Sequence, residues 1–266
     1  PINFAVVFSE PVSGFTNADV TLSGTAGATT VVVSGGGAVY NVAVSGMTAS
    51  GTVIATVNAG GAIDVANNTN FASTSTDNTV TYDNAIPSVT INQAVAQADP
   101  TAATPINFTV VFSETVTGFT NADVNLAGTA TGTLTAVVTG SGTTYNVAVS
   151  GMTGSGTVIA TVPAGGAIDS AGNGNTNSTS TDNIVTYDVT APTVTINQAV
   201  GQADPTNASP IDFTVVFSEP VTGFTNADVT LTGTAGAITA VVTGSGTTYN
   251  VAVSGMTTSG TVIASI

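Results

Sequence analysis

The feature that most limits the possible folds of this chain is an internal repeat. Nearly the same fifteen residues, FSEPVSGFTNADVTL in the first copy, occur three times, at 8–22, 112–126 and 217–231. The equivalent residues Phe4, Phe108 and Phe213 lie 104 and 105 residues apart. This period is the size of one small β domain and is too long for most solenoid repeats. The 266 residues are therefore expected to form tandem domains.

Short segments rich in valine and threonine alternate with Gly/Ser/Thr/Asn turns in every repeat. In segment 106–113, Ile106, Phe108, Val110 and Phe112 recur at every second position, which is typical of a half-buried strand. The middle repeat is expected to contain seven strands, near residues 88–92, 106–113, 123–127, 134–139, 144–150, 157–162 and 184–188. Seven short strands in about 100 residues favour an all-β fold of immunoglobulin-like β-sandwiches.

Prolines at 87 and 192 mark the expected boundaries between repeats, since proline suits the entry to a strand. The sequence predicts a partial Ig-like unit at 1–84 with strands B–G, a complete unit at 85–189, and a partial unit at 190–266 with strands A–F. A linker of only three or four residues favours a stiff rod of tandem sandwiches. The chain is expected to be a piece of a longer protein.

The charge of the chain is entirely one-sided, with 15 acidic residues and no lysine, arginine or histidine. Nucleic-acid binding requires a cationic surface, so no nucleic-acid partner is expected. Anionic membranes would repel the chain, and the absence of an apolar run of about 18 residues predicts no membrane insertion of this segment. Without histidine, lysine or cysteine, acid–base and nucleophilic catalysis are improbable, and the chain is predicted not to be an enzyme.

Two long segments, QADPTNASPIDFTVVFSEPVTGFTNADVTL and GTTYNVAVSGMTGSGTVIATVPAGGAIDSAGNGNTNSTSTDNIVTYD, resemble the bacterial Ig-like repeats of very large secreted surface proteins. The resemblance extends over the whole chain. It implies a secreted, cell-surface location and a role in extending a distal binding domain of an adhesin away from the cell. It also implies that calcium binds at domain junctions, as in several subfamilies.

The order of strands in a sandwich predicts where the acidic residues lie, because alternate loops share one pole. Five acids are expected at the junction of the first and second units: Asp83, Glu114, Asp123, Asp169 and Asp182. The next junction is expected to hold Asp188, Glu219 and Asp228, which Asp99 could join. Two carboxylates about 6 Å apart repel by roughly 3 kcal/mol at an effective dielectric constant of about 20. Because the chain supplies no cation, these hard oxygen ligands predict calcium rather than magnesium.

An alternative interpretation is that the acids are solvated or form local turns. Asp19, Asp123 and Asp228, each in the sequence NAD, could be turn residues only. The loop beginning at Asp169 is not an EF-hand, because it lacks an acid at the third position and a glutamate at the twelfth.

The first functional hypothesis is a non-catalytic spacer of an extracellular adhesin, with calcium-stiffened junctions and the neighbouring repeats as partners. The second is a subunit of a self-assembling filament or sheath, in which copies of the chain exchange strands at open sheet edges. A third, weaker hypothesis is direct ligand or ice binding by threonine-rich faces such as 193–195.

Overall fold

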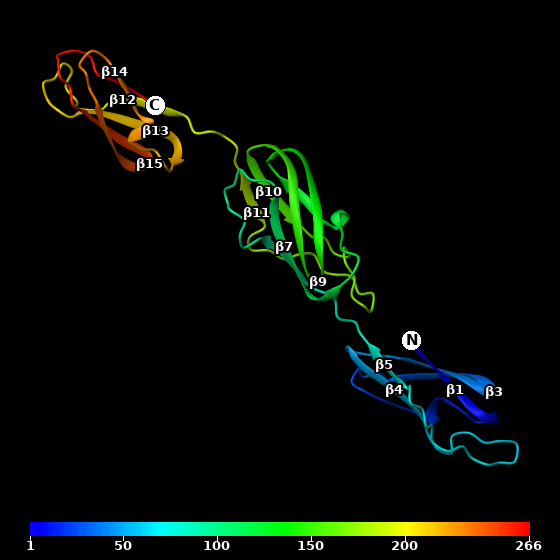
Figure 1. Ribbon diagram of the computed structural model, residues 1–266. Coiled ribbons are helices and arrows are strands. Elements are labelled where there is room, and N and C mark those ends of the chain that lie inside the picture. Colours follow the sequence, from blue (N-terminus) through cyan, green and yellow to red (C-terminus); the bar gives the residue numbers. More distant parts are fainter. The chain divides into compact units, whose positions relative to one another are not determined.

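The computed structural model describes residues 1–266 and consists almost entirely of antiparallel β-strands (Figure 1). The chain divides into two compact units, Pro1–Asp188 and Val189–Ile266. No helix has the length and apolar character that spanning a membrane requires. The elements of the first unit are β1 (Ile2–Val12), η1 (Asn17–Asp19), β2 (Val20–Ser23), β3 (Thr30–Ser45), β4 (Gly51–Val57), β5 (Thr79–Tyr82), β6 (Val89–Gln93), β7 (Ile106–Val116), η2 (Asn121–Asp123), β8 (Asn125–Gly128), β9 (Thr131–Gly154), β10 (Gly156–Thr161) and β11 (Ile184–Tyr187). Those of the second are β12 (Val194–Gln198), β13 (Ile211–Val221), η3 (Asn226–Asp228), β14 (Thr230–Thr232), β15 (Thr239–Ser254) and β16 (Ile263–Ser265).

Each of the three predicted repeats contains its own hydrophobic core. The cores draw their residues from 2–82, 89–187 and 196–264. The boundary between the compact units follows Asp188, one residue before the predicted end of the middle repeat, and the first compact unit holds the first two cores.

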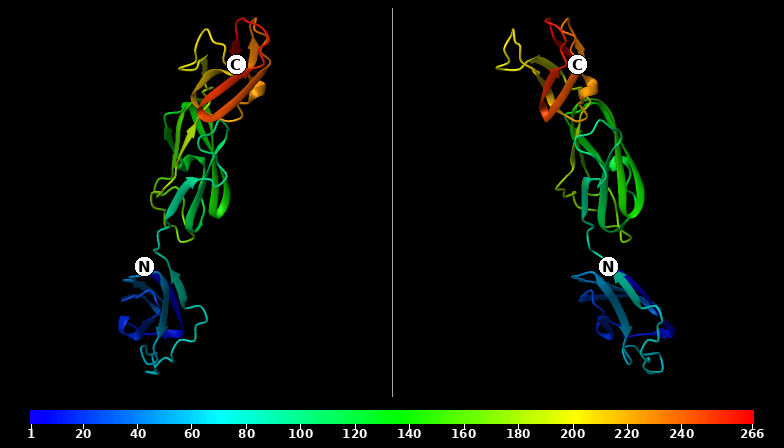
Figure 2. Two further views of the ribbon diagram at one scale, coloured as in Figure 1. Left: turned by 90° about the vertical axis from the view of Figure 1, so that its left-hand side faces the viewer. Right: turned by 60° about the vertical axis from the view of Figure 1, so that its left-hand side comes forward.

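The middle repeat is a sandwich of two three-stranded sheets, in the orders β6–β7–β9 and β8–β10–β11. Figure 2 shows this repeat, in green, from two further directions. Phe108 on β7 pairs with Val147 on β9, and Val158 on β10 pairs with Val185 on β11. All four side chains are fully buried, because the inner faces of the two sheets pack on each other. The all-β, immunoglobulin-like fold predicted from the sequence is confirmed.

The two strands predicted at 134–139 and 144–150 form one long element, β9, which folds back on itself. Hydroxyl contacts of 3.2 Å between Thr131 and Thr153 and of 3.4 Å between Thr135 and Ser150 join its two arms. The turn depends on Gly140, whose φ is +115°. A Cβ atom there would lie 2.6 Å from the carbonyl oxygen of Thr144, so only glycine fits.

The other two repeats have the same order of strands but one strand fewer. In the first, β1 to β5 correspond to β7 to β11, and residues 1–84 contain no counterpart of β6. In the third, β12 to β16 correspond to β6 to β10. The cores shrink accordingly, from 18 buried residues in the middle repeat to 9 in the first and 4 in the third.

Candidate metal centre

Three carboxylates come together at the start of the middle repeat. Asp83 follows β5, Glu114 lies on β7, and Asp169 lies on the loop between β10 and β11. One carboxylate oxygen of each residue lies within 4.8 Å of those of the other two. We refer to these three residues as the acidic cluster.

A bulge in β7 determines where Glu114 lies. The register between β7 and β9 shifts between Val111 and Val116, and Glu114 falls inside this irregular stretch. A bulge interrupts the strict alternation of side chains along a strand and redirects those within it. Glu114 is accordingly half-buried beside the loop that carries Asp169.

The loop that carries Asp169 is fastened to the end of β7. Ile168 and Thr117 exchange two main-chain hydrogen bonds, of 2.7 and 3.0 Å. The chain then turns, and Ile168 forms a second bridge, to Gly174. Asp169 is therefore held at the end of β7, close to Glu114.

Asp169 is a buried carboxylate that is held ionised by hydrogen bonds. Its Oδ1 accepts the main-chain N–H groups of Ala171 at 2.8 Å and Asn173 at 2.9 Å. Its Oδ2 accepts Nδ2 of Asn173 at 2.9 Å. These bonds, above all that from the Asn173 side chain, lower the pKa of Asp169 although burial opposes the shift. The side chain is only 4% exposed, and no cationic side chain exists in the chain to neutralise it.

Asp83 links the first repeat to the second. Its Oδ1 accepts a hydrogen bond of 2.8 Å from the hydroxyl of Ser50, directly before β4. Its main-chain oxygen accepts Nδ2 of Asn173 at 3.2 Å. The same amide group of Asn173 thus contacts Asp83 and Asp169, and it ties the end of the first repeat to the second.

The donor set of the acidic cluster fits a hard divalent cation. Two oxygens bound to one calcium ion at about 2.4 Å each lie at most about 5 Å apart. The separations within the cluster, up to 4.8 Å, lie inside this limit. Carboxylate oxygens on a bulge and a loop, with irregular geometry, suit calcium better than magnesium, which requires a tight octahedron.

Comparison with known proteins identifies the segment that contains this cluster. Residues 83–186 match the family model described as "Bacterial Ig-like domain". These residues form a bacterial Ig-like domain. The matched segment begins at Asp83 and includes all three residues of the acidic cluster. The match to a bacterial Ig-like domain supports the prediction that the chain is not an enzyme.

A comparison with curated proteins finds no match. Among solved structures, the chain is similar to one described as "FdeC, a Novel Broadly Conserved Escherichia coli Adhesin Eliciting Protection against Urinary Tract Infections". The similarity covers 99% of this chain and 82% of that one, at 15% sequence identity and a TM-score of 0.33. Similarity at this level supports no further conclusion.

Asp123 of the bacterial Ig-like domain lies outside the acidic cluster and forms a local turn. Its Oδ2 accepts both the main-chain N–H and the hydroxyl of Thr120, at 2.8 and 2.7 Å, in a capping box at η2. Asp19 makes the same two bonds to Thr16. These acids thus behave as the alternative interpretation of the sequence describes.

Asp182 and Asp99 of the bacterial Ig-like domain also lie outside the cluster. The main chain of Asp182 accepts the N–H of Gln93 and donates to Oδ1 of Asn92 at 3.2 Å, so this residue lies beside the end of β6. Asp99, which is expected at the second junction and not among the five acids of the first, accepts a hydrogen bond from the main-chain N–H of Thr186 on β11 at 2.9 Å. The convergence expected for five acids at the first junction is therefore limited to three.

The acids predicted at the second junction belong to different compact units. Asp188, in the first unit, accepts a hydrogen bond of 2.9 Å from the hydroxyl of Ser155. Its counterpart Asp83 accepts the equivalent hydrogen bond from the hydroxyl of Ser50. In the second unit, Glu219 lies on β13 within the same kind of register shift as Glu114. Oδ2 of Asp228 accepts hydrogen bonds from the main-chain N–H and the hydroxyl of Thr225, at 2.8 and 2.9 Å. A joint metal site of these residues stays a prediction.

Sequence reasoning missed Asn173, which holds Asp169 and contacts Asp83. A signal for it exists, because the pattern Asp-x-Ala-x-Asn occurs at 64–68 and again at 169–173. In the first repeat, Asp64 accepts the same three hydrogen bonds, from Ala66 and Asn68, each at 2.8 Å. The hydrogen bonds from Asn68 lower the pKa of Asp64 as those from Asn173 lower that of Asp169.

Proposed function

We propose that the chain is a structural spacer of an extracellular, adhesin-like bacterial surface protein, and that calcium bound by the acidic cluster stiffens the connection between its first two repeats. The observation that carries this proposal is the cluster itself: three carboxylates gathered within 4.8 Å in a chain without any cationic side chain. Like charges at this distance repel each other, and a divalent cation would convert the repulsion into attraction.

The position of the cluster favours a structural role over a catalytic one. Asp83 comes directly after the last strand of the first repeat, and its partners Glu114 and Asp169 belong to the second. An ion held by all three would limit the motion of the residues that join the repeats. Short linkers between repeats that are ordered by a bound ion suit a spacer, which must hold a distal binding domain away from the cell.

Calcium titration of the whole chain tests the metal site, with Glu114→Gln as the variant and Glu10→Gln as the matched control. Glu10 occupies the equivalent position on β1, but it is not part of the acidic cluster. After treatment with EDTA, we expect the wild type and Glu10→Gln to bind one more equivalent of calcium than Glu114→Gln. At a calcium concentration one hundred times its Kd, binding would stabilise the folded state by about 2.7 kcal/mol.

Equal calcium stoichiometry in the three proteins would refute the metal site.

The extracellular location of the protein is tested separately, by labelling intact cells of the source bacterium with an antibody against residues 85–189. Labelling that appears only after the cells are permeabilised would refute the extracellular assignment.

A further inference from the structure

Asn173 is followed by Gly174, and this is the only Asn-Gly sequence in the chain. The side-chain amide of an asparagine can be attacked by the main-chain nitrogen of the next residue, and a side chain on that residue hinders the attack. Glycine, which has no Cβ atom, hinders it least. Asn173 lies on the loop between β10 and β11, where it contacts Asp169 and Asp83. The asparagine most open to this reaction therefore lies where two repeats meet.

The first repeat contains the same loop with a different following residue. Asn68 occupies the position of Asn173, but Thr69 follows it. Asp64 accepts the main-chain N–H and Nδ2 of Asn68, each at 2.8 Å. Asp169 accepts the same two groups of Asn173, each at 2.9 Å. The two asparagines are thus held in the same way by a carboxylate.

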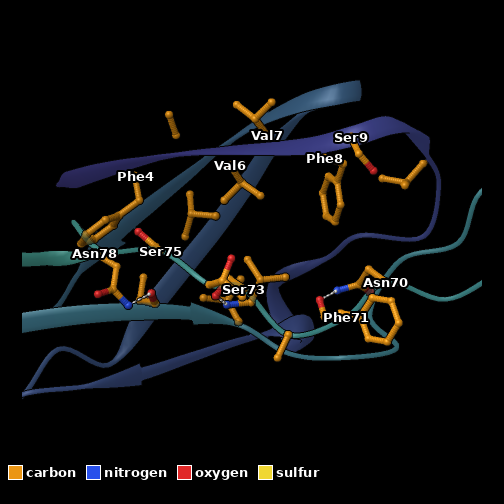
Figure 3. Close-up of a pocket in the computed structure, with 18 of the residues that line it drawn as sticks. Phe4, Val6, Val7, Phe8, Ser9, Asn70, Phe71, Ser73, Ser75 and Asn78 are labelled. Atoms are coloured by element: carbon orange, nitrogen blue, oxygen red, sulfur yellow. Dashed lines mark hydrogen bonds between the residues drawn. The ribbon is translucent and has the colours of Figure 1, made fainter.

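The two loops also agree in the residues that follow. In the first repeat, Nδ2 of Asn70 donates to the main-chain oxygen of Phe71 at 2.8 Å (Figure 3). In the second repeat, Nδ2 of Asn175 donates to the main-chain oxygen of Thr176 at 2.6 Å. The loops therefore provide a comparison within one chain, in which an asparagine in the same surroundings precedes threonine in one repeat and glycine in the other.

The fold does not require a glycine at position 174. The φ of Gly174 lies outside the left-handed region, and a Cβ atom there would come no closer than 3.2 Å to another atom, Cα of Gly165. Gly174 forms a bridge with Ile168, and Thr69 forms the equivalent bridge with Ile63. The same backbone arrangement therefore accommodates a threonine.

The main-chain nitrogen of Gly174 is free to attack. The bridge that this residue forms is bonded through its two neighbours. The N–H of Asn175 donates to the main-chain oxygen of Ala167 at 3.0 Å. The main-chain oxygen of Asn173 accepts the N–H of Asp169 at 3.1 Å. The N–H of Gly174 itself donates to no group of the protein, so no hydrogen bond has to break before it reacts.

We propose that Asn173 is a site of spontaneous deamidation. The main-chain nitrogen of Gly174 loses its proton to hydroxide and bonds to Cγ of Asn173. The bond between Cγ and Nδ2 then breaks, and Nδ2 takes up protons from water and leaves as ammonia. Water opens the resulting five-membered imide at either of its carbonyl carbons, which gives aspartate or isoaspartate. The reaction consumes one water molecule and needs no oxidant or reductant.

Deamidation would weaken the connection between the first two repeats. Nδ2 of Asn173 donates to Oδ2 of Asp169 at 2.9 Å and to the main-chain oxygen of Asp83 at 3.2 Å. Both hydrogen bonds are lost when a carboxylate replaces the amide, and a negative charge is added beside two acidic residues. No cationic side chain of the protein can compensate this charge. The contact between the repeats should therefore loosen as the protein ages.

Mass spectrometry of the aged full chain tests the modification site. The protein is incubated at about pH 8 in the presence of EDTA and is then cut by a protease that cleaves before aspartate. The fragments 64–76 and 169–181 contain the two asparagines to be compared, and fragmentation in the spectrometer locates the modified residue. We expect Asn173 to deamidate at least tenfold faster than Asn68.

A reciprocal pair of variants controls for the surroundings of the two asparagines. Gly174→Thr gives the second loop the following residue of the first, and it should slow the reaction of Asn173 at least tenfold. Thr69→Gly makes the opposite change and should accelerate the reaction of Asn68 by a similar factor. Unfolding would free both loops and speed the reaction, so a slower reaction in Gly174→Thr cannot result from misfolding.

Calorimetry tests the consequence for the connection. The midpoint of thermal unfolding of the first two repeats should fall as Asn173 deamidates, whereas Gly174→Thr of the same age should keep its original midpoint. An unchanged midpoint after complete deamidation would contradict the weakened connection.

Two outcomes would overturn the modification site itself: equal rates at Asn173 and Asn68 in the wild type, or an unchanged rate at Asn173 in Gly174→Thr. Neither depends on calcium, because EDTA is present throughout. The modification site and the proposed spacer function therefore fail separately.

Discussion

At the scale of single residues, hydrogen bonds from Asn173 lower the pKa of Asp169. The side chain and main chain of Asn173 donate to both carboxylate oxygens. We predict that Asn173→Ala raises this pKa toward the usual value of about 3.9. Titration of the carboxyl group by NMR measures the shift, and Asn68→Ala, which should affect Asp64 alone, is the control. An unchanged titration of Asp169 in Asn173→Ala would contradict the prediction.

The same hydrogen bonds predict how stability depends on pH. A carboxyl whose pKa is lowered by folding contributes stability above its unfolded pKa, and this contribution is lost as the pH falls through the folded value. The stability that depends on Asp64 and Asp169 should therefore begin to decrease below about pH 4 and should be lost only below their lowered folded pKa values. Urea unfolding at pH 7 and at pH 3 should show a smaller loss for Asn173→Ala than for the wild type.

Residue roles were only partly predictable from the sequence. The pattern Thr-x-x-Asp at 120–123 is a capping-box signature, so the turn role of Asp123 can be recognised without a structure. The meeting of Asp83, Glu114 and Asp169 depends on a bulge and on a loop bridge that leave no local signature. Loop order indicates a shared pole, but it does not give distances.

At the scale of elements, the alternation of apolar residues predicted strands such as β7 well, because its inner face is completely buried. The continuity of β9 was not predicted, since glycine and serine at 140–142 read as an ordinary break between strands. The positive φ values of Gly140 and Gly142 instead let the ladder continue through a tight turn.

This turn supports a paired prediction about alanine substitutions. Gly140→Ala would bring Cβ to 2.6 Å from a carbonyl oxygen, while Gly142→Ala meets no atom within 4 Å. Both positions have a positive φ, which costs alanine about 1 kcal/mol. We expect Gly142→Ala to destabilise by about that amount and Gly140→Ala by at least ~2 kcal/mol, because a steric clash adds to the cost. Urea unfolding measures both, and equal losses would contradict the assigned clash.

At the scale of the whole molecule, the three cores differ in size, and this difference should appear in unfolding. A core of 18 buried residues supports the middle repeat, whereas only 4 support the third. Stability in tandem repeats is a sum of the stabilities of the units and of nearest-neighbour terms, so the units need not unfold together. We therefore predict at least two transitions on heating, of which the lower belongs to the third repeat.

Matched core substitutions assign these transitions to the repeats. Val147 and Val251 occupy equivalent positions, and both are fully buried. Replacement by alanine removes two buried methyl groups and should cost about 2 kcal/mol at either site. Val251→Ala should lower only the first transition in calorimetry, and Val147→Ala only the later one. A single transition that both variants shift equally would mean that the repeats fold as one cooperative unit, and the separate cores would then not be independent sources of stability.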